Sequence, residues 1–203
     1  VCHEIADSLP DLTVNTDRLA PEVLITVENF TEDSCAFAEE CIGTVDLEGI
    51  EGNRRLLRFS TEVINQGQAL LEVPLPQFRP DIFEYSACHD HFHYTGFARN
   101  ELLDASGTLV VTGLKQAFCM EDTDRYYSSP AYSCNDGSDC EFPGISPGWT
   151  DLYGNSLDCQ WLDITGVPPG DYQLRVIANE GRSFMEESFD NNVSMVPVTI
   201  PPL

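Results

Sequence analysis

The chain has 203 residues and a formal net charge of −24, with 34 acidic residues against 10 basic ones. This balance excludes a general binder of the nucleic acid backbone, and the negative field attracts cations such as amines and metal ions instead. No apolar run approaches the roughly 18 residues of a membrane-spanning helix, and the length, with no repeat or linker, predicts one domain over residues 1–203.

Apolar runs that are rich in β-branched residues and bounded by turn residues predict short β-strands along the whole chain. In chain order these runs lie at residues 23–27, 56–60, 69–73, 108–112, 172–177 and 193–200. Helical periodicity is limited to residues 32–41. Many short strands separated by turns predict an all-β fold, an antiparallel β-sandwich with long irregular loops.

The longest predicted loop covers residues 121–155, which are rich in Ser, Pro, Gly, Asp and Tyr. Long irregular segments within a compact domain are usually functional. We therefore expect this segment to form the wall of a site, pinned by Cys134 and Cys140.

Eight cysteines, with no Cys-x-x-Cys pair, predict four disulfides that staple the fold. Disulfides persist in oxidising compartments, so we expect a secreted, extracellular or periplasmic protein. The chain starts at Val1-Cys2 with neither an initiator Met nor a signal-peptide pattern, and we expect that any targeting segment has been removed.

Three of the four histidines follow Cys88 at alternate positions, as His89, His91 and His93. Imidazole is the commonest transition-metal ligand, and alternation places the three rings on one face of a strand. A straight strand would separate the outer two by roughly 13 Å, too far for one ion. We therefore predict a metal site at an irregular strand end, the alternative being surface histidines that cluster by chance.

Several runs, in the right order, resemble the catalytic domain of the lysyl oxidase family from about residue 10 to residue 195. They are CHDHFHY at 88–94, LKQAFCMEDT at 114–123, SPG at 146–148 and YGNSLDCQWLDIT at 153–165, with PDL at 10–12, RF at 58–59 and VINQG at 63–67. The resemblance implies a prokaryotic-type or single-domain member of the family.

The resemblance implies that His89, His91 and His93 bind copper, and that Lys115 and Tyr153 form the built-in cofactor lysine tyrosylquinone. The implied reaction is the oxidative deamination of peptidyl lysine or small primary amines. It consumes O2 and yields an aldehyde, ammonia and hydrogen peroxide. The resemblance is also compatible with a precursor form, in which zinc occupies the copper site and Lys115 and Tyr153 lie apart.

The catalytic base is not identified by sequence. Asp151, Asp158 and Asp163 lie close to Tyr153 along the chain, and Asp151 is the preferred candidate. A turn or capping role is the alternative for each carboxylate.

A calcium site is a further implication of the resemblance. Its oxygen ligands would come from Asp11, the Leu12 carbonyl, Glu186, Asn191 and Asn192, and such ligands suit calcium. Ser188 replaces one family acid, for which Asp190 is a substitute, and the alternative is an Asx-rich turn.

The family's disulfide pattern implies three pairs and leaves two cysteines to form a fourth. The pairs are Cys35–Cys88, Cys41–Cys159 and Cys119–Cys134, with Cys2 and Cys140 left over. This chain departs from the family at Trp149, where a Cys is usual, near Asp124, where its partner is missing, and at Ser86, where a His is usual.

Two other functions remain open at this point. One is a catalytically silent, secreted metal-binding β-sandwich for adhesion or copper handling. The other is a purely structural secreted domain, which would leave the histidines without metal. The presence of Lys115 and Tyr153 beside the histidine motif favours the enzyme, because a silent domain needs neither residue.

Overall fold

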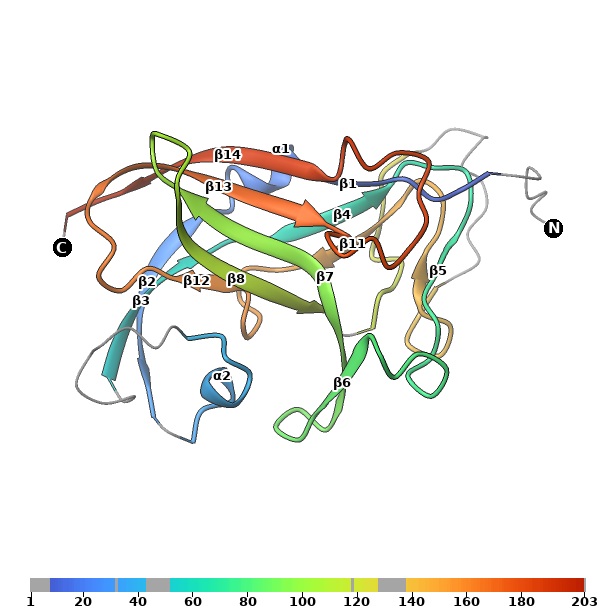
Figure 1. Cartoon of the computed structure of the whole chain (residues 1–203), viewed down its shortest axis with the longest axis horizontal. Helices are drawn as coiled ribbons and strands as arrows, with labels where there is room; N and C mark the ends of the chain where they lie inside the picture. The colour runs from blue at the N-terminus through green and yellow to red at the C-terminus, as the bar shows by residue number, and fades with distance from the viewer. Residues whose placement is uncertain (1–7, 32, 43–51, 118, 128–137, 203) are drawn as a thin grey trace.

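The computed structural model describes residues 8–31, 33–42, 52–117, 119–127 and 138–202, and at 114–117 the backbone alone. This part of the chain consists of short strands, two four-residue helices and connecting loops (Figure 1). The elements are β1 (Leu12–Val14), α1 (Thr16–Leu19), β2 (Leu24–Phe30), α2 (Cys35–Ala38), β3 (Gly52–Arg58), β4 (Thr61–Asn65), β5 (Leu71–Glu72), β6 (Phe83–Ser86), β7 (His91–Leu103), β8 (Leu109–Ala117), β9 (Asp124–Arg125), β10 (Gly144–Ile145), β11 (Trp149–Tyr153), β12 (Trp161–Asp163), β13 (Gly170–Ala178) and β14 (Val193–Ile200).

The described strands pair in antiparallel fashion in four sheets. The largest has the order β14-β13-β7-β6, with β8 also paired to β7. A second has the order β1-β4-β11-β9, a third β12-β3-β2, and β10 pairs with β5. The first two sheets carry the residues of the candidate site.

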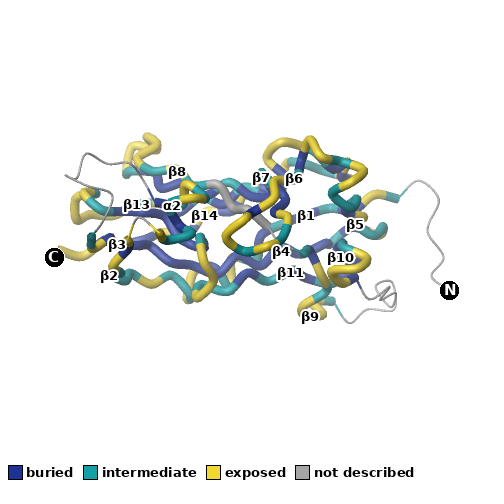
Figure 2. The backbone as a smooth tube through the Cα atoms, turned by 90° about the horizontal axis from the view of Figure 1, so that it is seen from below, coloured by how far each residue is buried: buried dark blue, intermediate teal, exposed yellow. Residues whose placement is uncertain are grey.

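The main core lies between the large sheet and the strands opposite it. Val63 of β4, Phe97 of β7, Val176 of β13 and Val198 of β14 belong to one buried cluster. Figure 2 shows the buried segments running along the strands, while the exposed segments lie mainly in the loops. The predicted all-β, antiparallel and disulfide-stapled fold is confirmed, and the shared core gives it the layering of a sandwich.

Alternation of buried and exposed residues is clearest in β14. Ser194, Val196, Val198 and Ile200 are buried, whereas the residues between them are exposed. A strand whose two faces meet core and solvent has this period of two. In contrast, all five residues of β4 are buried, so both faces of this strand are covered.

The predicted strands are found, with shifted ends. The run at 193–200 matches β14, 172–177 lies within β13, and 23–27 and 108–112 each overlap a longer strand. The run at 69–73 is reduced to β5, and the helix expected at 32–41 is reduced to α2. The prediction that residues 121–155 form an irregular loop is wrong in part, because β9, β10 and β11 lie within this range and β11 is paired with β4 and β9.

Three disulfides join the described cysteines. Cys35–Cys88 and Cys41–Cys159 confirm the implied pairs.

The third disulfide, Cys119–Cys140, shows that the implied pairs Cys119–Cys134 and Cys2–Cys140 are wrong. Backbone hydrogen bonds hold the two flanking segments side by side: the Gly144 amide donates to the Met120 carbonyl at 2.9 Å and the Asp122 amide to the Ser138 carbonyl at 3.1 Å. Cys2 and Cys134 lie outside the described residues.

None of the helices in the described residues has the length and apolar character needed to cross a membrane.

Candidate metal centre and its surroundings

The three histidines lie at the hairpin that joins β6 to β7. Ser86 of β6 is paired with His91 of β7, so residues 87–90 form the turn between them. Asp90 adopts a positive φ of 57°, a conformation that Asp tolerates better than most residues. His89 therefore lies in the turn, and only His91 and His93 share a strand face. The irregular strand end expected from the spacing is confirmed.

The turn brings the three imidazoles together. Their ring centroids are 4.8–5.5 Å apart, and one nitrogen from each ring lies within 4.8 Å of the others. The closest pair of nitrogens, Nε2 of His91 and Nε2 of His93, are 2.9 Å apart. Burial lowers the pKa of His91, and the neighbouring imidazoles lower it further. The neutral form that binds metals is thereby favoured.

Glu39 lies against this cluster, and sequence reasoning missed it. Its Oε1 atom is 2.9 Å from Nδ1 of His89 and 3.7 Å from Nδ1 of His93. The Ser86 hydroxyl donates to the same oxygen at 2.5 Å. The signal in the sequence was the position of Glu39 between Cys35 and Cys41, the partners of Cys88 and Cys159.

A cavity of about 360 Å³ opens beside the histidines and also reaches β11. Its lining includes Asp151 and Tyr153, together with Glu121, Leu157 and Asp158. The structure thus brings the histidine motif, the tyrosine and two of the three candidate bases to one cavity.

Tyr153 is buried, with 6% of its surface exposed, and its ring lies 6.3 Å from that of Phe97 between centroids. Burial raises the pKa of its phenol well above the usual value, and the nearby Asp151 carboxylate, to which the hydroxyl hydrogen bonds, raises it further. Tyr153 is therefore a neutral phenol at physiological pH.

The candidate bases differ in their surroundings. Asp151 is buried in the cavity next to Tyr153, whereas Asp158 is largely exposed, with its Oδ2 atom 3.7 Å from Nε2 of His89. Asp163 lies outside this cavity lining, and its carboxylate forms a buried ion pair with Arg54 at 3.6 Å. The structural role weighed for Asp163 is therefore the better account of that residue.

Lys115 lies on β8, and its backbone is paired with Ala98 of β7. Two residues further along β8, Ala117 is paired with Tyr94, which follows His93 directly. The strand that carries the lysine therefore runs beside the strand that carries two of the histidines. The side chain of Lys115 lies outside the described residues.

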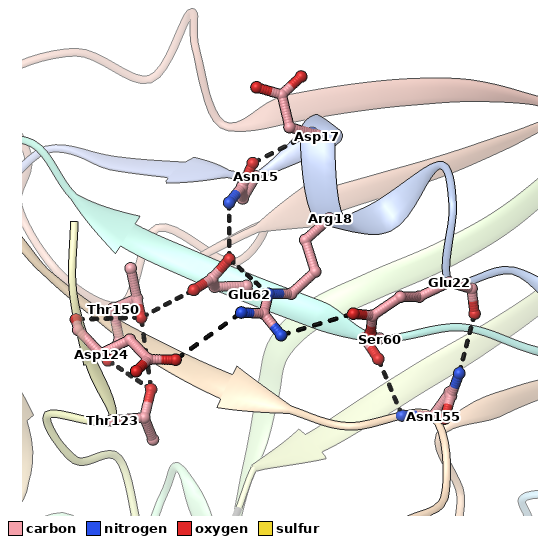
Figure 3. Close-up of polar contacts among 10 residues, drawn as sticks. All are labelled: Asn15, Asp17, Arg18, Glu22, Ser60, Glu62, Thr123, Asp124, Thr150 and Asn155. Atoms are coloured by element: carbon pink, nitrogen blue, oxygen red, sulfur yellow. Dashed lines mark hydrogen bonds and ion pairs between the residues drawn. The ribbon is translucent and has the colours of Figure 1, made fainter.

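Behind β11, a buried polar network ties this strand to its neighbours (Figure 3). The carboxylate of Glu62, on β4, accepts hydrogen bonds from Asn15 at 2.6 Å, Arg18 at 3.0 Å and Thr150 at 3.0 Å. Arg18 also reaches Asp124 of β9 at 3.7 Å. Helix α1 and strands β4, β9 and β11 are thus fixed to one another at the back of the strand that carries Asp151 and Tyr153.

The residues of the implied calcium site also lie together. Oε2 of Glu186 accepts a hydrogen bond from the Leu12 amide at 2.6 Å, and its Oε1 accepts one from Asn192 at 2.8 Å. The Asn191 amide group donates to Asp11 at 3.0 Å. The side-chain oxygens of Asn191 and Asn192 are buried without a hydrogen-bond partner among the described residues. Such oxygens are suited to a hard cation.

Comparison with known proteins identifies the family of the chain. The sequence model described as "Lysyl oxidase" matches residues 10–200. The chain is 34% identical to lysyl oxidase homolog 2 of Mus musculus and of Homo sapiens, and 36% identical to lysyl oxidase homolog 3B of Danio rerio, over 95% of its own length in each case. It spans about a quarter of the length of these relatives, 24% for homolog 2 and 23% for homolog 3B. The chain belongs to the lysyl oxidase family.

Proposed function

We propose that this domain is a copper- and lysine tyrosylquinone-dependent amine oxidase that acts on peptidyl lysine or small primary amines. The observation that carries the proposal is the cavity of about 360 Å³ shared by the three histidines, Asp151 and Tyr153. A site that only stored copper would not require a buried tyrosine with a carboxylate partner in the same cavity. Family membership supports the same class of enzyme.

The histidine cluster fits a copper ion by the chemistry of its donors. Three neutral imidazoles that converge within 4.8 Å form a set suited to copper, and also to the zinc of a precursor. In the proposed site His89, His91 and His93 hold the metal. The cavity beside them gives O2 and the amine access to Tyr153.

When bound and matured, the copper and quinone pair would supply the oxidation of the amine carbon and the reduction of O2 to hydrogen peroxide. The protein's own residues have other tasks. Tyr153 and Lys115 are the proposed precursors of the cofactor. Burial of Tyr153 against Phe97 fixes the orientation of its ring.

Asp151 is the proposed base. Its carboxylate lies in the cavity and hydrogen bonds to the Tyr153 hydroxyl, so it can accept a proton at the reacting end of that ring. Asp158, at the exposed rim, is the second candidate because it lies 3.7 Å from His89 rather than against the tyrosine.

The calcium site is proposed for Asp11, the Leu12 carbonyl, Glu186, Asn191 and Asn192. The buried amide oxygens of Asn191 and Asn192, which lack a hydrogen-bond partner in the part of the chain that the structure describes, support it. A cation there would join β1 to the segment before β14.

The proposed substrates are lysine-containing proteins or small primary amines, with O2 as co-substrate. The three disulfides of the described residues support an oxidising, extracellular location. The net charge of −24 is consistent with cationic substrates rather than nucleic acid.

Peptide mapping of copper-matured protein tests the proposal. We expect a covalent cross-link between the peptides that contain Lys115 and Tyr153, quinone absorbance, and hydrogen peroxide formation on addition of an amine. Tyr153→Phe should abolish all three. Tyr172→Phe is the matched control, because that tyrosine lies on β13 with its hydroxyl bonded to the Pro168 carbonyl.

The silent metal-binding sandwich is the competing function. It predicts copper binding without a cross-link, quinone absorbance or peroxide. That result for the copper-matured wild-type protein would refute the enzyme.

A further inference from the structure

The segment from Cys35 to Cys41 holds a carboxylate against the histidine cluster. Helix α2 begins this segment, and Glu39 follows the helix directly. Both ends of the segment are fixed, since Cys35 is bonded to Cys88 and Cys41 to Cys159. These partners adjoin His89 and Asp158 in the sequence. The segment is therefore cross-linked to both walls of the site.

The carboxylate that this segment holds is well oriented. The Glu39 side chain is only 8% exposed, and its Oε1 atom lies 2.9 Å from Nδ1 of His89. The Ser86 hydroxyl donates to that oxygen at 2.5 Å, and the His89 amide donates to Ser86 at 3.1 Å. Glu39, Ser86 and the turn at His89 thus form a closed set of hydrogen bonds.

The contact determines which nitrogen of His89 is available to a metal. With Nδ1 held by the Glu39 carboxylate, Nε2 is the nitrogen of this ring that can bind a metal, and the exposed Asp158 carboxylate lies 3.7 Å from it. A carboxylate behind a ligating imidazole fixes its tautomer and orientation and increases its basicity. The same oxygen is 3.7 Å from Nδ1 of His93, beyond hydrogen-bond distance but close enough for an electrostatic contact with this second ring.

We propose that Glu39 is the positioning residue of the metal centre, acting through His89 and secondarily through His93. The inference rests on the proposed copper site but concerns a residue that the family resemblance did not supply. Glu39 is not proposed to touch the substrate or the metal. Its role is to determine how tightly, and in what geometry, the imidazoles bind the ion.

Three variants of the full chain separate this role from charge and packing. Glu39→Leu removes the hydrogen-bond acceptor, while Glu39→Gln retains an acceptor without the charge. Glu40→Gln is the matched control, because Glu40 is the adjacent acid and is exposed. Copper(II) affinity is measured by competition with a chelator, and the ligand field by electron paramagnetic resonance. Thermal unfolding of the metal-free proteins monitors the fold.

We expect Glu39→Leu to raise the copper Kd about 10- to 100-fold, as is typical when such an outer carboxylate is lost, and to change the copper hyperfine splitting. Glu39→Gln should restore most of the wild-type spectrum and raise the Kd only about fivefold, because a neutral hydrogen bond replaces a charge-assisted one. Glu40→Gln should match the wild type in both measurements.

A Glu39→Leu protein with the wild-type Kd and spectrum would overturn the role of Glu39 while leaving the copper site intact. If that variant does not fold, Glu39→Gln decides, and an unchanged Kd then overturns the proposal. A wild-type protein that bound no copper would overturn the proposed function as well. Copper binding without a Lys115–Tyr153 cross-link would overturn the oxidase but not the role of Glu39.

Discussion

Replacement of Glu62 by Ala should destabilise the fold more than removal of any acid at the surface of the same network. Glu62 is 3% exposed and accepts hydrogen bonds from Asn15, Arg18 and Thr150 (Figure 3). Without it, the fully buried Thr150 hydroxyl loses its acidic partner, and the Arg18 guanidinium loses its most buried one.

The size of the effect follows from these contacts. Each buried polar group left without a partner costs about 1–3 kcal/mol, and breaking a buried charged pair costs about 3–5 kcal/mol in all. Arg18 is one-third exposed and retains its contacts with Glu22 and Asp124, so we expect the lower end of that range, about 3 kcal/mol. For a chain of this length the loss corresponds to a fall in Tm of about 6–12 °C.

Guanidinium and thermal unfolding with the disulfides intact measure this loss. Glu22→Ala is the control. The ion pair of Glu22 with Arg18 is 3.5 Å long, and the Glu22 side chain is over a third exposed. Ion pairs exposed to solvent in this way contribute about 0–1 kcal/mol to stability. Thr150→Val in both backgrounds gives the coupling to Glu62, expected at about 0.5–3 kcal/mol. If Glu62→Ala costs no more than Glu22→Ala, the assignment of this network as a structural anchor of β11 is refuted.

Three further results are expected. Burial and Asp151 raise the pKa of the Tyr153 phenol in the folded protein, so the contribution of this residue to stability is complete below a pH of about 10 and falls as the pH rises towards the pKa of the folded state. In alkaline unfolding titrations, the wild type should therefore lose stability above that pH faster than Tyr153→Phe. Parallel curves for the two proteins would contradict this expectation. Calcium at a hundredfold excess over its Kd should add about 2.7 kcal/mol to the unfolding free energy of wild type but not of Glu186→Gln, and an equal gain would exclude the site. The Cys41→Ala/Cys159→Ala double variant lacks the disulfide between two cysteines that are 118 positions apart. Its free energy of unfolding, measured with a chemical denaturant, should be lower than that of the wild type by about 2–5 kcal/mol. A negligible difference would show that this disulfide constrains only the site.

The fold could be predicted where local pattern and burial agree. The strand at 193–200 was found because its alternation reflects one face on the core and one in solvent. β11 was missed because it follows a Pro- and Gly-rich stretch and is short. Its pairing with β4 and β9 depends on residues far away in the sequence. The helix at 32–41 was overestimated, since Glu40 has a positive φ of 55° that ends helical structure after α2.

The sequence predicted some residues of the site and missed others. The histidines form a local motif, so their spacing alone indicated a metal. The resemblance supplied Lys115 and Tyr153, and the structure places Tyr153 in the same cavity. Glu39 could not be found from local sequence, because its contact with His89 spans 50 positions and depends on where the fold places the segment that Cys35–Cys88 links. The pairing of Cys119 with Cys140 was missed for the same reason, since connectivity is a property of the fold.

Two of the described disulfides lie beside residues of the site, since Cys88 adjoins His89 and Cys159 adjoins Asp158. The segment that carries Glu39 also packs in a second buried cluster, which includes Ala36, Ile42 and Trp161 and against which Cys41 and Cys159 lie. The covalent links there add to this packing and restrict the segment further. The geometry of the metal centre should therefore depend on an oxidising compartment, which links the proposed location of this domain to its proposed chemistry.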